Sequence, residues 1–344
     1  MNTIVNCRFI SNAGHKTERK MTYYRLFTWA AISIVISGFL VGSTALGSTP
    51  GCPDCPDWIN FQSWWDNYHS DPVKDNPSST SSLKAVREAA EAQEKEKIDN
   101  MAYSAAELLV SSDDDLSGRI ILDARAPEDY ERGHLSGARN VYWKSIQYES
   151  TLNPNLALHA LRKAGVNNYD SIVVCGSGED SAYLFWTLDY LGHDKLSLLD
   201  GDVTSSGMTL VQNAPSPNES NYSTEIRTWL SVDELTLDKH QDNPSGVQIW
   251  DARPNFIDYG KCHLERANHL STSKLYTDLG KKKFKSAGEL GQLFDRLDED
   301  KNQIIYGTPG ACSLYFALKL MGYNSAVLDG DWWKNMDDTI KPIS

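Results

Sequence analysis

One short loop offers a nucleophile in a setting that could activate it: Cys175, Gly176, Ser177, Gly178, Glu179, Asp180 and then Ser181. The loop follows an apolar strand predicted over 171–174 and precedes an apolar helix that begins near Ser181. At such a junction the free N–H groups and the dipole of the helix stabilise negative charge, which lowers the pKa of a thiol. We therefore predict that Cys175 is an exposed, activated nucleophile. The glycines let the amides of residues 176–181 form an anion cradle around its sulfur.

Two features of the loop qualify this prediction. Ser177 is placed to donate a hydrogen bond to the sulfur, which favours the thiolate. Glu179 and Asp180 act in the opposite direction, because their charges raise the pKa of a neighbouring thiol and repel an anionic substrate. An inert, half-buried thiol at Cys175 remains the alternative.

The elements that must position this loop occur twice in the chain. The first copy has Asp123, Arg125, Tyr130 and His134, and the second has Asp251, Arg253, Tyr259 and His263, in the same order. Each copy then continues through an apolar strand, a small-residue loop and a helix, and it closes on a strand ending in Leu-Asp-Gly-Asp. Copies of this length can each bury a core, which predicts a duplicated α/β domain rather than a solenoid repeat.

The charged residues that recur in both copies are better explained by structure than by catalysis. Asp123 with Arg125, and Asp251 with Arg253, follow predicted strands, where such pairs fix a loop through a hydrogen-bonded salt bridge. His134 recurs in the copy that has no loop cysteine, which argues for a hydrogen bond that fixes the fold rather than for a general base.

Both copies resemble rhodanese domains, the sulfurtransferase family, in its tandem arrangement. The resemblance covers roughly 101–213 and 225–344 and rests on the Asp-x-Arg pairs, the Gly133-His134-Leu segment, the Cys175 loop and the Leu-Asp-Gly closings. It implies two α/β domains, each with a central parallel sheet flanked by helices. It also implies that Cys175 accepts sulfane sulfur as a persulfide and passes it to a nucleophile such as a thiol or cyanide.

The second copy departs from the family pattern. Tandem members usually carry the working cysteine in the second domain, but here Tyr306 or Gly307 takes its place in a shorter loop. We therefore expect the second domain to be non-catalytic. Cys312 follows near the first turn of the next helix, where a buried, inert thiol is the simpler interpretation.

A leader precedes the repeats and predicts the compartment. Basic residues stand before an uncharged, apolar stretch over 26–47, the pattern of an export signal or of a membrane anchor. The positive charge on its N-terminal side puts the domains outside the cytoplasm, in the periplasm, on the membrane or secreted. We divide the chain into the leader (1–47), a Trp-rich segment with a helical linker (48–100), the first repeat (101–213), a linker (214–224) and the second repeat (225–344).

The segment 48–100 begins with Cys52-Pro-Asp-Cys55. Outside the cytoplasm this spacing most simply predicts a local disulfide. A redox-active pair that exchanges with Cys175, or half of a metal site, are the alternatives.

The net charge of −13 excludes nucleic acid as a partner, because no basic patch offsets it. The favoured function is an exported sulfurtransferase that works through Cys175 on a small sulfur-compound donor and a thiol acceptor, without metal or cofactor. The alternative is a binding or redox-partner protein of the same fold, in which neither domain turns over and the loop recognises a sulfur compound or another protein.

Overall fold

The computed structural model describes residues 77–233, 246–264 and 266–330. Both repeats belong to one compact unit. The predicted leader and the pair Cys52 and Cys55 lie outside the described residues. Within the described ranges, no helix is long and apolar enough to cross a membrane.

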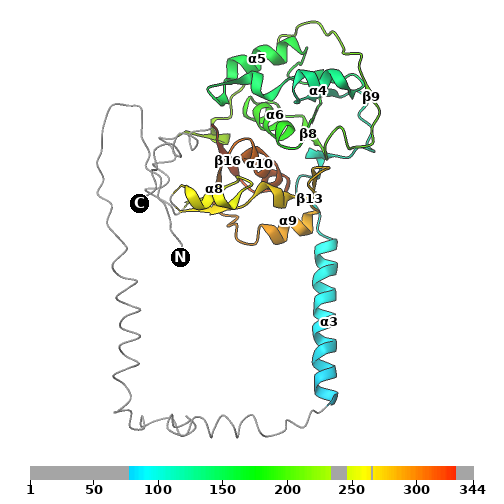
Figure 1. Ribbon diagram of the computed structural model, residues 1–344, viewed down its shortest axis with the longest axis vertical. Coiled ribbons are helices and arrows are strands. Elements are labelled where there is room, and N and C mark those ends of the chain that lie inside the picture. Colours follow the sequence, from blue (N-terminus) through cyan, green and yellow to red (C-terminus); the bar gives the residue numbers. More distant parts are fainter. Residues whose placement is uncertain (1–76, 234–245, 265, 331–344) are drawn as a thin grey trace, which may run out of the picture. The chain divides into compact units, whose positions relative to one another are not determined.

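The first repeat is built on a parallel five-stranded sheet with the order β1-β8-β7-β2-β4 (Figure 1). Its strands are β1 (Leu109–Val110), β2 (Ile120–Asp123), β4 (Arg139–Asn140), β7 (Ile172–Cys175) and β8 (Leu196–Leu199). Its helices are α4 (Pro127–Arg132), α5 (Pro154–Lys163) and α6 (Glu179–Tyr190). Two small antiparallel pairs complete it: β3 (His134–Leu135) with β9 (Leu210–Val211), and β5 (Gln147–Tyr148) with β6 (Thr151–Leu152).

The central strand β7 is buried on both faces, as expected for a continuous Ile-Val-Val run in a parallel sheet. Ile172 and Val174 join the large core that includes α5 and α6. Val173 and Cys175 point to the opposite face, into a smaller cluster with Tyr130 of α4 and Leu135 of β3. This alternation, which follows from the period of two in a strand, decides which face of the sheet receives the thiol.

The second repeat has the same topology, with the sheet order β10-β16-β15-β11-β12. Its strands are β10 (Ser231–Val232), β11 (Val247–Asp251), β12 (Ala267–His269), β15 (Asn302–Tyr306) and β16 (Ser325–Leu328). Its helices are α8 (Phe256–Lys261), α9 (Ala287–Leu293) and α10 (Gly310–Leu320), and β13 (Tyr276–Asp278) pairs with β14 (Lys283–Phe284) as a hairpin. The predicted duplication of an α/β domain with a central parallel sheet is confirmed.

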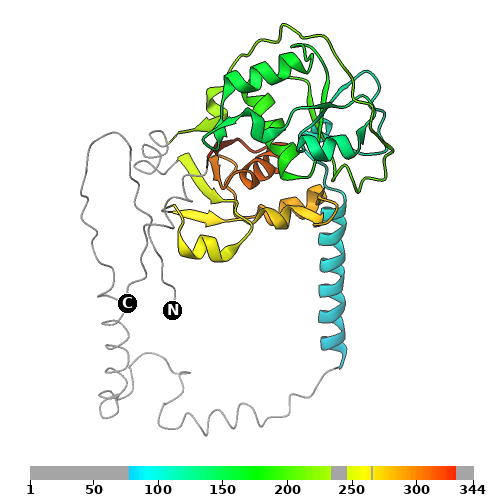
Figure 2. The same cartoon turned by 45° about the horizontal axis from the view of Figure 1, so that its top comes forward.

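The two repeats pack against each other through α6 and α10, which lie side by side in both views (Figure 1, Figure 2). Both helices are buried along most of their length, because each packs against the other as well as against its own sheet. The rings of Phe185 and Phe316 meet edge to face at 4.9 Å. Asp189 of α6 forms an ion pair of 2.6 Å with Lys319 of α10, at equivalent positions of the two helices.

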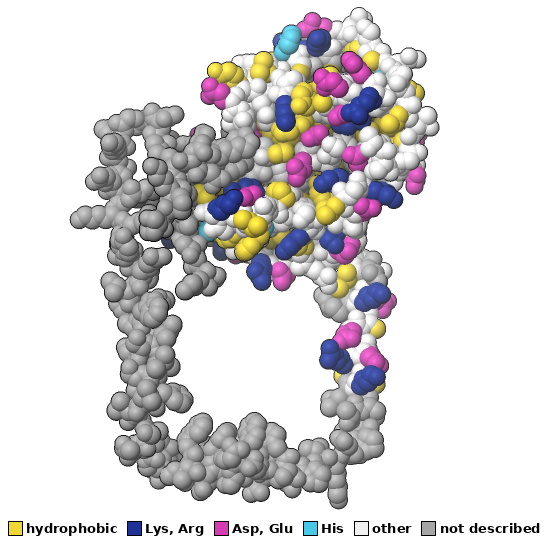
Figure 3. All heavy atoms as spheres, viewed as in Figure 1, with side chains coloured by type: hydrophobic (Ala, Val, Ile, Leu, Met, Phe, Trp, Pro, Cys, Tyr) yellow, Lys and Arg dark blue, Asp and Glu magenta, His cyan; other side chains and the backbone are white. Residues whose placement is uncertain are grey.

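Helix α3 (Pro77–Asp99) precedes the first repeat. It carries exposed pairs one turn apart, Lys84 with Glu88 and Arg87 with Glu91. Over the face of the molecule shown in Figure 3, basic and acidic side chains are interspersed.

Candidate functional site

Cys175 is the last residue of β7 and lies beside Asp123, the last residue of β2, in the register of the sheet. Its side chain is fully buried, in a cluster with Tyr130, Leu135 and Val203. Helix α6 begins only at Glu179. The thiol therefore ends a strand instead of lying exposed at the mouth of the helix.

The prediction of an exposed thiol with a lowered pKa was wrong. Burial raises the pKa of Cys175 well above its ordinary value, and the charge of Asp123 raises it further. Arg125 acts in the opposite direction but does not outweigh them. The sequence correctly indicated a strand-to-helix junction, but the alternation of β7 turns the sulfur into the apolar face.

The loop side chains also differ from their predicted roles. Ser177 donates a hydrogen bond of 2.9 Å to Asp180 and not to the sulfur. Glu179 accepts a hydrogen bond of 3.3 Å from Thr272 of the second repeat. Burial raises the pKa of Asp180. The carboxylate that raises the pKa of Cys175 is therefore Asp123, and not Glu179 or Asp180 as predicted.

The backbone of the loop retains features of the predicted cradle. Gly178 is the residue before α6 and adopts a φ of 61°, a conformation that favours glycine. The hydroxyl of Ser181 donates to the carbonyl of Gly178 at 2.7 Å. Among the described residues, the N–H groups of Gly176 and Ser177 have no hydrogen-bond acceptor.

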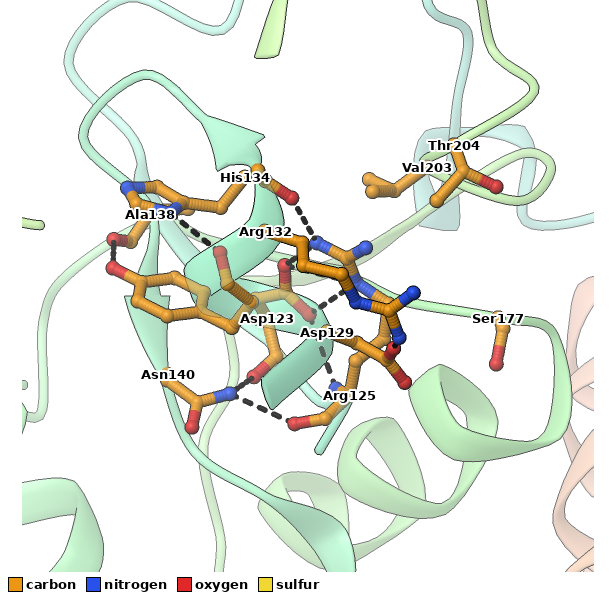
Figure 4. Close-up of polar contacts among 12 residues, drawn as sticks. Asp123, Arg125, Asp129, Arg132, His134, Ala138, Asn140, Ser177, Val203 and Thr204 are labelled. Carbon is orange, nitrogen blue, oxygen red and sulfur yellow. Dashed lines mark hydrogen bonds and ion pairs between the residues drawn. The ribbon is translucent and has the colours of Figure 1, made fainter. Parts of the chain in front are cut away.

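A buried ion pair lies beside the start of the loop. The guanidinium of Arg125 binds the carboxylate of Asp123 at 2.6 Å and donates to the carbonyl of Gly133 at 2.8 Å (Figure 4). Arg253 and Asp251 form the same pair at 2.6 Å in the second repeat. Because the arrangement recurs where the loop cysteine is missing, it fixes the fold in both repeats.

His134 is also held by a structural contact. Its Nδ1 lies 2.9 Å from the carbonyl oxygen of Tyr130, and the two rings stack at 3.9 Å. His263 repeats the contact with Tyr259, at 2.8 Å and 4.2 Å. Neither histidine lines the pocket beside the loop.

A pocket of about 310 Å³ opens beside the loop of the first repeat. It is lined by residues from α4 and the segments on either side of it, from the Cys175 loop, from the turn after β8 and from β9: Arg125, Asp129, Arg132, Gly133, Ser177, Asp202, Thr204 and Leu210. Figure 4 shows Arg132 reaching from α4 toward the side of Ser177. Arg132 and its ion-pair partner Asp129 were not predicted. The recurrence of this pair in the second repeat, as Lys261 with Asp258, was the signal that could have indicated them.

The same position in the second repeat holds a phenol. Tyr306 ends β15 beside Asp251, just as Cys175 ends β7 beside Asp123. The register thus aligns Tyr306, and not Gly307, with the cysteine. Its buried hydroxyl accepts a hydrogen bond of 3.2 Å from the amide of Leu264.

The second repeat contains two further cysteines, neither of which occupies the position of Cys175. Cys312 is free and completely buried near the start of α10, and burial raises its pKa. Cys262 stands where the first repeat has Gly133, and it is disulfide-bonded. Among the described residues, no group of three or more His, Cys, Asp or Glu side chains could hold a metal ion.

A family model described as a rhodanese-like domain matches residues 104–205 and 232–335. The chain belongs to the rhodanese-like family. Both matches coincide with the two parallel sheets, so the tandem arrangement is confirmed.

Curated relatives and solved structures agree with this assignment. A protein of Haloferax volcanii, provisionally named a thiosulfate sulfurtransferase, is 25% identical over 279 residues, which cover 67% of this chain and 95% of that protein. A similarly named protein of Mycobacterium bovis is 26% identical over 59% of this chain and 83% of its own length. The structure of a 3-mercaptopyruvate sulfotransferase from Escherichia coli matches with a TM-score of 0.55 at 22% identity, over 63% of this chain and 93% of the other.

Proposed function

We propose that this rhodanese-like chain is a sulfurtransferase in which Cys175 of the first repeat carries the sulfur. The register of the two sheets is the observation that supports it most. A thiol stands beside Asp123 in the first repeat, whereas a phenol stands beside Asp251 in the second. The names of the curated relatives support the same class of reaction.

The reaction would proceed in two balanced displacements. The Cys175 thiolate attacks the outer sulfur of a donor such as thiosulfate, a bond forms between the two sulfurs, and sulfite leaves with the electron pair of the broken S–S bond. An acceptor thiolate then attacks the outer sulfur of the persulfide, and the Cys175 thiolate is released. No external oxidant or reductant enters either step.

The residues around the pocket would assist an anionic donor. Arg125 and Arg132 line it, and the free N–H groups of Gly176 and Ser177 are available to the departing anion. The cost lies in the nucleophile, because Cys175 is buried and its pKa is raised. Attack therefore requires the loop to move and expose the sulfur, and we expect turnover to be slow at neutral pH.

The second repeat would be a non-catalytic partner. Tyr306 fills the position of the nucleophile, and the disulfide-bonded Cys262 replaces a glycine that lines the pocket of the first repeat. Cys312 is enclosed between the repeats and has no exposed surface.

One observation favours a different function. The full burial of Cys175, with its raised pKa, is what a protein that binds a sulfur compound or a redox partner without turning over would tolerate. In that alternative the pocket recognises a ligand and the thiol only packs.

Mass spectrometry after exposure to thiosulfate distinguishes the two functions. The sulfurtransferase predicts a gain of one sulfur on the peptide that contains Cys175, lost again when a thiol acceptor is added. C175S should abolish the gain and C312S should leave most of it. A gain that disappears only in C312S would reverse the assignment of the active repeat, and no gain with any donor would favour the binding protein.

Export remains a proposal that rests on the sequence of the leader. The apolar stretch over 26–47 and the basic residues before it support an extracytoplasmic location, either released or anchored. Fractionation of the producing cells, with sequencing of the N-terminus of the mature protein, tests both points. A full-length chain in the cytoplasmic fraction would contradict export.

A further inference from the structure

A basic turn of the second repeat lies on the candidate site of the first. We call Lys281, Lys282 and Lys283, which end the connection between β13 and β14 and begin β14, the lysine turn. The carbonyl of Lys281 accepts a hydrogen bond of 2.6 Å from the amide of Asp202. A methyl group added to Gly178 would lie 3.1 Å from the Cδ atom of Lys282. The turn therefore touches both the Cys175 loop and the segment after β8.

The three ammonium groups of the lysine turn are not held in close ion pairs. None of the three ammonium groups forms an ion pair with a described carboxylate. The ammonium of Lys282 lies 5.2 Å from the centre of the Tyr276 ring, a contact that stabilises the cation without cancelling its charge. The charge of Lys283 lowers the pKa of Asp200, which burial otherwise raises. Three consecutive cations thus stand together in a chain of net charge −13.

Their place relates them to the pocket. Ser177 and Asp202 line the pocket. Ser177 precedes Gly178, on which Lys282 packs, and Asp202 is bound to Lys281. The lysine turn therefore adjoins the rim at these two residues, while Arg132 lines the pocket from α4. None of the three lysines lines the pocket itself, but the lysine turn contacts two segments that do.

We propose that the lysine turn forms part of the donor-binding surface of the first repeat and selects a dianionic sulfur donor of the thiosulfate type. The loop carries Glu179 and Asp180, which would repel such a donor. The lysines supply the compensating field from the other repeat, and such a field raises the local concentration of an oppositely charged ligand. This inference rests on the proposed function, and it gives the non-catalytic repeat a role in the specificity of the reaction.

Binding is measured separately from turnover, so the two proposals can fail independently. C175S cannot form a persulfide, and its affinity for thiosulfate is measured by titration calorimetry at several salt concentrations. In that background Lys281, Lys282 and Lys283 are replaced by glutamine. We expect Kd to rise about tenfold and its salt dependence to flatten, because electrostatic focusing of this kind changes association by about tenfold or more.

A matched control removes the same charge elsewhere. Lys163 ends α5, and Lys195 and Lys301 directly precede β8 and β15, at the amino ends of the strands and away from the site. Replacing these three by glutamine should leave Kd nearly unchanged. The single variant K281Q, at the most exposed of the turn lysines, should show part of the effect if the triple variant folds poorly.

Each outcome has one meaning. A larger Kd in the lysine-turn variant but not in the control supports the proposal, even if the native protein never gains sulfur. Equal affinities in the two triple variants, or no binding of thiosulfate to C175S, overturn it. The mass gain on Cys175 in the native protein decides the proposed function alone.

Discussion

Asp200 of the first repeat accepts a hydrogen bond of 2.9 Å from the amide of Phe284 in the second. The contact is reciprocated, because Asp329 at the same place in the second repeat accepts one of 2.7 Å from the amide of Leu152 in the first. Phe284 lies in the hairpin β13–β14 and Leu152 in the hairpin β5–β6. The aspartate that closes each repeat therefore holds the hairpin of the other.

This exchange predicts a change in stability with pH. Burial raises the pKa of Asp329. A carboxyl with a raised folded pKa stabilises the fold fully below its unfolded pKa of about 4 and loses that contribution as pH rises through the folded pKa. D329N stays neutral at every pH, and its amide oxygen can still accept from Leu152. Relative to the native protein, its free energy of unfolding in urea should increase from about pH 4 to neutrality.

The control variant, D298N, should show the opposite change of stability with pH. Hydrogen bonds from Lys301 and from the amide of Asp300 lower the pKa of Asp298. Its contribution is present above the unfolded pKa and is lost as pH falls through the folded pKa. D298N should therefore lose stability relative to the native protein as pH rises, and the same trend in both variants would contradict the assignment for Asp329.

A second prediction concerns the thiol and its neighbouring carboxylate. D123N removes the charge that raises the pKa of Cys175 and leaves Arg125, which lowers it. The pKa of Cys175, followed by the ¹³Cβ chemical shift of labelled cysteine, should fall. D251N is the matched control, because it breaks the equivalent pair with Arg253. Both variants should lose about 3 kcal/mol of stability, since each leaves a buried guanidinium without its partner.

If D251N lowered the pKa of Cys175 as much as D123N did, the effect would come from loosening of the fold. The charge of Asp123 would then not control the thiol.

The third prediction concerns the boundary between the repeats. Asp189 is buried and binds Lys319 at 2.6 Å, Arg227 at 2.6 Å and the hydroxyl of Tyr315 at 2.7 Å. D189N leaves Lys319 without its carboxylate and Arg227 with only the exposed Asp194, and it should lower the free energy of unfolding by about 3 kcal/mol. D194N removes an exposed partner of the same Arg227, and it should cost less than about 1 kcal/mol. Equal losses in urea unfolding would show that burial of Asp189 is not what matters.

The fourth prediction concerns Tyr306. Y306F leaves the buried amide of Leu264 without this acceptor, which should cost about 1–3 kcal/mol in urea unfolding. Sulfur transfer should be unchanged, because the second repeat holds no nucleophile at this position. Y148F, at an exposed tyrosine, should change stability by less than about 0.5 kcal/mol. Loss of transfer in Y306F with native stability would place this tyrosine in the reaction.

The duplication and the parallel sheets could be predicted because both depend on patterns within each repeat. Apolar runs such as 171–174, and pairs such as Asp123 with Arg125, report local structure. The burial and the raised pKa of Cys175 could not be predicted. They depend on the face of β7 to which its last side chain points and on a carboxylate from the neighbouring strand. Ser177 was assigned to the sulfur because its sequence position does not show that Asp180 lies within 2.9 Å of its hydroxyl.

Contacts between the repeats were beyond prediction for the same reason. Glu179 looked like a charge facing the loop, but Thr272 of the other repeat binds it. Asp189 and Lys319 occupy equivalent positions, yet neither copy alone shows that they meet. An interface between two similar domains becomes visible only once their packing is known.

The alignment of Tyr306 with Cys175 has a consequence in terms of codons. Tyrosine and cysteine codons differ by a single base, so one point mutation exchanges the phenol and the thiol at the end of β15. The residues around Tyr306 differ from those around Cys175 by more than one mutation. The loop of the second repeat is shorter, and Cys262 stands where the first repeat has Gly133. A mutational path that exchanges a cysteine for Tyr306 is thus one step long, whereas a path that rebuilds the complete loop of the first repeat needs several. The tyrosine is therefore easy to reach and the surroundings of Cys175 are hard to recreate in the second repeat.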